Sequence, residues 1–156
     1  MKSLVIDVSK CTGCRMCELS CSVNKEKRIA PHLGRVNVFS DWENGLSTPV
    51  VCYQCVDAVC MKVCPVGALS RDSRTNAVVL DEKICIGCRQ CTVACPFGGI
   101  VFSSEKQKIL KCDLCNGQPV CVTFCPTGAI KYEVPQKAGL SKRRSIADKA
   151  LRYFEK

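Results

Sequence analysis

The sequence of 156 residues has few aromatic side chains, a single histidine and a single tryptophan, and no long apolar run. No stretch approaches the roughly 18 apolar residues that a membrane-spanning helix needs. The N-terminal segment "MKSLVIDVSKC" has one lysine, a short apolar run and then an aspartate, which is too little for the core of a signal peptide. We therefore expect a cytoplasmic chain with no direct membrane span.

The sequence also lacks the parts of an active site. It has no glycine-rich loop to hold a nucleotide and no nucleophile paired with a histidine. The one histidine, His32, follows a proline, and it could be a pH sensor, a ligand or an ordinary solvated loop residue. We therefore expect no catalysis by this chain alone.

Cysteine, in contrast, is abundant, and all 16 cysteines fall into four groups. Each group opens with two cysteines separated by two residues and closes with two separated by three, whereas the middle gap varies. In order, the groups are Cys11, Cys14, Cys17 and Cys21; Cys52, Cys55, Cys60 and Cys64; Cys85, Cys88, Cys91 and Cys95; and Cys112, Cys115, Cys121 and Cys125. This repeat predicts the same metal chemistry at four places.

The spacing has a mechanical interpretation. Two cysteines separated by two residues let a loop wrap one metal centre, and small residues such as Gly13 and Gly87 help the loop to bend. The third and fourth cysteines of each group share one face of a helical turn. Proline follows the fourth cysteine in groups two to four and turns the chain out of the helix, whereas group one has Ser22 there.

Three other uses of the cysteines are weaker. Zinc sites usually take two close pairs per ion, which is not the spacing of three cysteines followed by Cys-Pro. Disulfides suit an oxidising compartment, and a redox-active Cys-x-x-Cys pair needs a thioredoxin-like βαβ context that is absent here. Iron–sulfur clusters are therefore favoured.

The formal charge of +9 suggests nucleic-acid binding at first sight. Four oxidised [4Fe–4S] clusters with their thiolates would together contribute about −8 and leave the loaded chain near +1. We therefore expect no nucleic-acid partner.

The four groups, with "KCDLC" at 111–115 and "CPVGAL", "CPFGGI" and "CPTGAI" after three of them, resemble the four-cluster ferredoxin subunits of oxidoreductase complexes. That family serves dimethyl sulfoxide reductases, formate dehydrogenases, hydrogenase-linked assemblies and tungsten aldehyde oxidoreductases. The resemblance covers residues 1–134 and implies four [4Fe–4S] clusters.

Spacing alone leaves three ways to pair the groups. The resemblance implies that group two pairs with group three and that group one pairs with group four. The implied ligand sets are Cys52, Cys55, Cys60 and Cys95; Cys64, Cys85, Cys88 and Cys91; Cys11, Cys14, Cys17 and Cys125; and Cys21, Cys112, Cys115 and Cys121.

The expected fold class is α+β, with two ferredoxin-like modules, one nested in the other, around four cubane clusters. Strands are predicted at 3–8, 77–81, 99–103 and 129–133. One strand–turn–strand unit is predicted between groups two and three, and another between groups three and four. A helical turn is predicted to begin near each third cysteine. We expect an outer module of 1–30 and 105–134, a connecting loop at 31–48, an inner module of 49–104 and a basic tail at 135–156. Because such short elements bury little surface, we expect the clusters to replace much of the core and the apo-protein to be largely unfolded.

Two features outside the cysteine groups remain open. Trp42 could be a docking residue, or it could cover a cluster edge and exclude water. The tail has the capping pattern and apolar spacing of a short terminal helix, which could pack on its own domain, dock on a partner subunit or lie on a membrane surface.

These observations favour an electron-transfer subunit that passes single electrons between a catalytic subunit and a redox acceptor, which could be a flavin subunit. The preferred partner is a large tungsten or molybdenum oxidoreductase subunit, with aldehyde oxidoreductase first. The alternatives are a hydrogenase- or carbon-monoxide-dehydrogenase-linked ferredoxin subunit, and a freestanding polyferredoxin carrier or redox sensor. Basic residues beside the groups could raise the cluster potentials or could simply be solvated: Lys10, Arg15, Lys83, Arg89 and Lys111.

Overall fold

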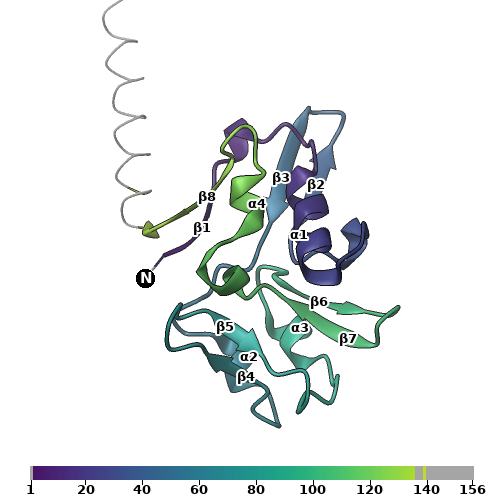
Figure 1. Ribbon diagram of the computed structural model, residues 1–156, viewed down its shortest axis with the longest axis vertical. Helices are drawn as coiled ribbons and strands as arrows, with labels where there is room; N and C mark the ends of the chain where they lie inside the picture. Colours follow the sequence, from purple (N-terminus) through teal and green to yellow (C-terminus); the bar gives the residue numbers. More distant parts are fainter. Residues whose placement is uncertain (1, 136–138, 140–156) are drawn as a thin grey trace, which may run out of the picture.

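The computed structural model describes residues 2–135 and 139, and within them the chain is a small α+β protein (Figure 1). Its helices and strands are short, and half of the connections between them contain cysteines. In chain order they are β1 (Ser3–Ile6), η1 (Val8–Lys10), α1 (Met16–Glu26), η2 (Pro31–Leu33), β2 (Asn37–Asp41), β3 (Leu46–Val50), α2 (Val59–Lys62), β4 (Leu69–Arg71), β5 (Val78–Leu80), α3 (Gln90–Ala94), β6 (Ile100–Ser103), β7 (Lys108–Lys111), η3 (Leu114–Gly117), α4 (Val120–Thr123) and β8 (Ile130–Glu133).

The predicted elements are confirmed. The four predicted strands correspond to β1, β5, β6 and β8, and the two strand–turn–strand units correspond to the antiparallel pairs β4–β5 and β6–β7. Each third cysteine lies at the start of a helix, α1, α2, α3 or α4. The predicted tail helix lies outside the described residues.

The connecting loop expected at 31–48 is instead an ordered unit. It begins with η2 and continues into an antiparallel hairpin of β2 and β3, in which Val38 faces Pro49. The sequence does carry a local signal for this hairpin, because its turn contains the hairpin dipeptide Asn44-Gly45, although Pro49 in the second strand argues against a strand there. Trp42 lies in this turn with 78 % of its surface exposed, which favours the docking alternative over the one in which it covers a cluster edge.

Helix α1 is the longest of the described helices, and its length follows from the residue after the fourth cysteine of its group. Ser22 stands where the other groups have proline, so the helix continues to Glu26. The Ser22 hydroxyl is fully buried, donates to the carbonyl of Leu19 at 2.8 Å and accepts the amide of Ala30 at 3.3 Å. Ser22 therefore fixes the chain that leaves α1 as well as the helix itself.

The strand pairs arrange the described chain in two halves. β1 pairs with β8, with Ser3 opposite Glu133 and Ile6 opposite Ile130, so the first and last strands meet. Figure 1 shows this pair with α1, α4 and the β2–β3 hairpin in the upper half, and β4–β7 with α2 and α3 in the lower half. Segments that are far apart in sequence therefore share the upper half.

Cysteines occupy core positions in both halves. One core combines small and medium apolar side chains with five buried cysteines, namely Leu4, Val36, Val38, Val51, Ala77, Leu114 and Ile130 with Cys17, Cys21, Cys52, Cys112 and Cys121. The other combines Ala58, Leu69, Val78, Ile100 and Ile109 with Cys60 and Cys91. Any metal group that these buried thiols bind would therefore contribute directly to the stability of the fold.

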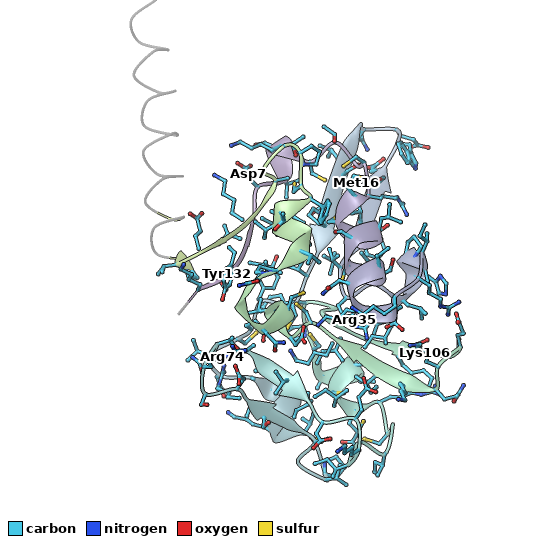
Figure 2. The ribbon with its side chains drawn as sticks, in the orientation of Figure 1. Asp7, Met16, Arg35, Arg74, Lys106 and Tyr132 are labelled. Atoms are coloured by element: carbon cyan, nitrogen blue, oxygen red, sulfur yellow. The ribbon has the colours of Figure 1, made fainter. Side chains whose placement is uncertain are left out.

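Ion pairs join the end of α1 to the β6–β7 turn. The buried Glu26 carboxylate accepts hydrogen bonds from Arg35 and from Lys106, both labelled in Figure 2. Burial alone would raise the pKa of the Glu26 carboxyl, but these two hydrogen bonds hold it below its ordinary value. In the same turn Glu105 pairs with the exposed His32 at 2.7 Å, so that histidine is a solvated surface residue.

None of the helices within the described part of the chain has the length and apolar character needed to cross a membrane.

Candidate metal centre

The loop that opens each cysteine group has the same backbone bend. The residue just before the second cysteine has a positive φ in every group: 70° at Gly13, 52° at Gln54, 67° at Gly87 and 56° at Leu114. The role of Gly13 and Gly87 is confirmed, because glycine adopts this conformation at little cost. Gln54 and Leu114 adopt it without that freedom, and no pattern in the sequence indicates that they do.

The segment that closes groups two to four is a repeated turn. In each sequence Cys-Pro-x-Gly, the glycine amide donates to the carbonyl of the fourth cysteine, at 3.3 Å for Gly67, 3.5 Å for Gly98 and 3.3 Å for Gly128. All three glycines have φ of 63–64°. The proline ends the helical turn as predicted, and the glycine redirects the chain into the following strand.

Amide groups donate hydrogen bonds to four of the cysteine sulfurs. Backbone N–H groups donate to Cys21 Sγ from Arg35 at 3.2 Å, to Cys64 Sγ from Ala68 at 3.2 Å and to Cys112 Sγ from Leu114 at 3.4 Å. The side-chain amide of Asn24 lies 3.5 Å from Cys115 Sγ. Such hydrogen bonds stabilise negative charge on sulfur and tune the potential of a cluster held there.

One cavity is lined by four thiols from two different groups. Cys52, Cys55 and Cys60 of group two line it together with Cys95, the last cysteine of group three. About 380 Å³ of empty space lies there, including its opening to solvent. Gly99 is required beside it, because a Cβ at this position would lie 2.8 Å from Cys52 Cα.

A second cavity has the same construction in the upper half. Cys112, Cys115 and Cys121 of group four line it together with Cys21, the last cysteine of group one. About 320 Å³ of empty space lies there, including its opening to solvent. Beside it the Lys25 ammonium pairs with the Asp113 carboxylate at 2.6 Å.

Of the remaining eight cysteines, six lie in or pack against the two cores. Cys11 and Cys125 pack against the core that contains Cys17, and the charge of Cys14 acts on Cys17. In the lower half, Cys64 and Cys85 pack against the core that contains Cys91, and the charges of Cys85 and Cys88 act on Cys91. All sixteen thiols are free of disulfides.

Burial makes these thiols hard to ionise without a cation. It raises the pKa of Cys17 and of Cys112 to about 12, against the opposing effect of backbone amides. The pKa of Cys121 is also raised, first by burial and then by the charges of Cys112 and Cys21. Metal binding would therefore have to displace protons from buried thiols, which couples loading to folding.

The arrangement fits iron–sulfur clusters better than single metal ions. Among residues 2–135, no three His, Cys, Asp or Glu side chains come together closely enough to hold one metal ion. A [4Fe–4S] cluster needs something different, because each of its four irons takes one thiolate and the ligands surround a bulky body. The two cavities, each lined by four thiols, provide one ligand for each iron of such a cluster. When bound, such a cluster supplies one-electron chemistry.

The thiols form one continuous series of electrostatic neighbours across the molecule, and Figure 2 shows sulfur atoms in both halves and between them. In order, the series is Cys14, Cys17, Cys121, Cys112, Cys52, Cys60, Cys91 and Cys88. The two end members are exposed, and the six between them are buried. The thiols at the two ends of this series therefore reach solvent.

The basic residues beside the groups differ from one another. Lys111 is buried, and its ammonium donates to Cys52 Sγ at 3.2 Å. The others are exposed, and three of them have other contacts: Lys10 pairs with Asp7, Arg15 pairs with Glu18, and Arg89 stacks on Phe102. Adjacency to a cysteine does not tell which side chain turns inward, so the sequence could not distinguish Lys111 from the rest.

Comparison with known proteins identifies the family. The family described as "4Fe-4S dicluster domain" matches residues 44–134, and a "4Fe-4S binding domain" matches residues 8–24. The polyferredoxin-like subunit of an aliphatic sulfonate oxidoreductase from Pyrococcus furiosus is 42 % identical, over 78 % of this chain and 70 % of that protein.

Two further relatives come from Escherichia coli. The electron transport protein HydN is 38 % identical, over 91 % of this chain and 95 % of that protein, and a subunit of anaerobic dimethyl sulfoxide reductase is 36 % identical, over 81 % and 70 %. Among solved structures, one component of the active-site complex BamBC of benzoyl coenzyme A reductase with benzoyl-CoA is 25 % identical, with a TM-score of 0.50 over 100 % of this chain and 99 % of that one. The chain belongs to the 4Fe-4S dicluster family of ferredoxin-type proteins, and it is an iron–sulfur electron-transport protein and not an enzyme on its own.

Proposed function

We propose that the sixteen cysteines hold four [4Fe–4S] clusters and that the chain carries single electrons along them. The cavity of Cys52, Cys55, Cys60 and Cys95 would hold one cluster, and that of Cys21, Cys112, Cys115 and Cys121 another. We assign the other two to Cys11, Cys14, Cys17 and Cys125, and to Cys64, Cys85, Cys88 and Cys91. The observation that carries this proposal is that each cavity combines three thiols of one group with the last thiol of another.

The ligand sets support a nested pair of ferredoxin-like modules. The outer module would comprise 1–30 and 105–134, and its unity is supported by the pairing of β1 with β8. The inner module would comprise 49–104, which includes β4, β5, β6 and the helices α2 and α3. Residues 31–48, with most of the β2–β3 hairpin, would then connect the two.

The electron path follows from the order of the thiols. The site that contains exposed Cys14 and the site that contains exposed Cys88 would be the two terminals. The two cavities would hold the central clusters, since buried Cys112 and Cys52 are neighbours in the series. Electrons would enter at one terminal and leave at the other, because these are the sites whose thiols reach the surface at the two ends of the series.

The partner is a catalytic oxidoreductase subunit. Relatives that carry the names of oxidoreductase subunits support this class. Within it we propose a tungsten or molybdenum enzyme, with an aldehyde oxidoreductase first, on the family resemblance of the cysteine pattern. A flavin or other acceptor subunit would take the electrons, and a cytoplasmic location stays a prediction from the sequence.

The ligand sets can be tested with cysteine-to-serine variants prepared without oxygen. We expect about sixteen irons in the parent protein, since four clusters carry four irons each. C95S and the double variant C95S/C52S should lose the same single cluster, whereas C95S/C91S should lose two, as measured by iron content and electron paramagnetic resonance (EPR). If C95S/C91S loses only one cluster, the four cysteines of group three share a site and the proposed sets are wrong.

The partner can be tested by native purification of the tagged chain without oxygen. Co-purification of one large protein that contains tungsten or molybdenum would support the proposal. Co-purification of a hydrogenase or carbon monoxide dehydrogenase, or elution of the chain alone with reduction of several acceptors, would instead support one of the alternatives.

A further inference from the structure

Lys111 is a buried cation between the two cavities. Its side chain is only 7 % exposed, and its ammonium lies 3.2 Å from Cys52 Sγ and 3.1 Å from the carbonyl oxygen of Cys112. Cys52 lines the first cavity and Cys112 the second. One positive charge therefore contacts a residue of each central site.

The charge of Lys111 has no carboxylate partner within the described chain. Its ammonium contacts a thiol, a carbonyl and, at 3.5 Å, the side-chain oxygen of Gln54. A buried ammonium is costly unless an anion compensates it. Lys25 shows the usual solution beside the second cavity, because Asp113 pairs with it at 2.6 Å.

Thiolates of the central sites can supply the missing negative charge. A [4Fe–4S] cluster with its four thiolates carries a net charge of about −2 when oxidised and about −3 after it accepts one electron. A fixed cation beside it favours the more negative state, and a low local dielectric strengthens this effect.

We propose that Lys111 is a charge-tuning residue shared by the two central sites, which makes both of them easier to reduce than they would be without it. It acts most on the site of Cys52, whose sulfur it contacts, and less on the site of Cys112, whose carbonyl it contacts. None of its hydrogen bonds within the described chain goes to a cysteine assigned to a terminal site, so the central relay becomes more favourable for an electron that enters from either end. This inference rests on the proposed ligand sets.

The test compares K111M, K111Q, K111R and the parent, all as full-length protein loaded and purified without oxygen. Iron content is measured first, and each cluster is then titrated with dithionite and followed by EPR. In K111M we expect full iron and at least a tenfold fall in the equilibrium constant for reduction of one cluster, which is about 59 mV for one electron. A second cluster should shift in the same direction by less, and the remaining two should not move.

Two controls separate charge from structure. K111R retains the charge and should restore the parent potentials to within about threefold. K131M makes the same change at an exposed lysine of β8 and should leave all four potentials unchanged.

Several outcomes would overturn the proposal. Unchanged potentials in fully loaded K111M would show that the charge does not act on the clusters, and equal shifts in all four would show that the effect is not local. Loss of clusters from both K111M and K111Q would assign Lys111 a structural role instead. A failure of the ligand sets themselves is distinguished by the iron content and EPR of the parent.

Discussion

Gln54 provides a sharp test of how the two central sites are held together. It is only 1 % exposed, its side-chain nitrogen donates to the carbonyl of Cys112 at 2.9 Å, and its side-chain oxygen accepts the amide of Val78 at 2.8 Å. One side chain therefore ties the loop of group two both to strand β5 and to the loop of group four. We expect Gln54→Leu to destabilise the loaded protein.

The size of the effect follows from what the substitution leaves unpaired. The Val78 amide loses this acceptor, and a buried group without its partner costs about 1–3 kcal/mol. The Cys112 carbonyl still accepts a hydrogen bond from the Lys111 ammonium at 3.1 Å, so losing the hydrogen bond from Gln54 costs little there. The expected destabilisation is therefore about 2 kcal/mol, the cost of one unpaired buried group and not of two.

Gln107 offers a matched control. It has the same φ of 52° as Gln54, but it is exposed in the β6–β7 turn, where its side chain donates to the carbonyl of Ser104. Gln107→Leu therefore repeats the chemical change in the same backbone conformation without burial. We expect a change within about 0.5 kcal/mol.

The assay follows loss of cluster absorbance in guanidinium chloride without oxygen, after a fixed incubation. With a slope of about 4 kcal/mol per molar, Gln54→Leu should lower the midpoint by about 0.5 M and Gln107→Leu by about 0.1 M or less. Equal midpoints for the two variants would refute the reasoning, because burial and the Val78 contact are what distinguish the two glutamines.

Three other changes probe separate parts of the molecule. Gly99→Ala should cost one cluster of four by iron analysis, since its Cβ would meet Cys52 Cα at 2.8 Å, whereas Gly45→Ala has nothing within 4 Å and should retain all of them. Glu26→Gln should lower the free energy of unfolding by about 1–3 kcal/mol, because Arg35 and Lys106 lose their carboxylate partner. The guanidinium midpoint should fall accordingly. The pKa of Glu26 is lower in the folded protein than its ordinary 4.5, so its contribution is complete above that pH and declines as the pH falls through the folded value; the gap between parent and variant should narrow there. Removal of iron by a chelator should leave a chain whose amides exchange rapidly with solvent, and a protected apo fold by hydrogen exchange would contradict this.

Much of the fold could be predicted because the cysteine pattern and the local periodicity point the same way. The third cysteine begins a helical turn, the fourth precedes a proline that ends it, and a strand follows the glycine of the Cys-Pro-x-Gly turn. Each of these is decided within a few residues, so no tertiary information is needed.

The contacts between groups could not be predicted in the same way. Nothing in the spacing shows that Cys95 lines a cavity with Cys52, or that Lys111 turns inward while Lys10 stays at the surface. Those facts depend on which loops meet in space. The β2–β3 hairpin is a different case, because Asn44-Gly45 in its turn is a local signal that the expectation of a loop at 31–48 left unused.

One distinction among the groups was nevertheless present in the sequence. Groups one and three have glycine before the second cysteine and a middle gap of two residues, and these are the groups whose second cysteines, Cys14 and Cys88, are exposed. Groups two and four have Gln54 and Leu114 at that position, both 1 % exposed, and longer gaps.

The difference has a physical basis. Glycine allows the loop to bend with no side chain to bury, so the sulfur after it can remain near the solvent. A larger residue at positive φ costs about 1–3 kcal/mol, and at Gln54 and Leu114 this conformation is accompanied by burial in the centre of the molecule. The residue before the second cysteine thus separates the terminal sites of the proposed electron path from the central ones. Gln54→Gly should reveal this difference through two opposing effects. Glycine would remove the cost of the positive φ at position 54, but it would also remove the side-chain hydrogen bonds that join the central sites.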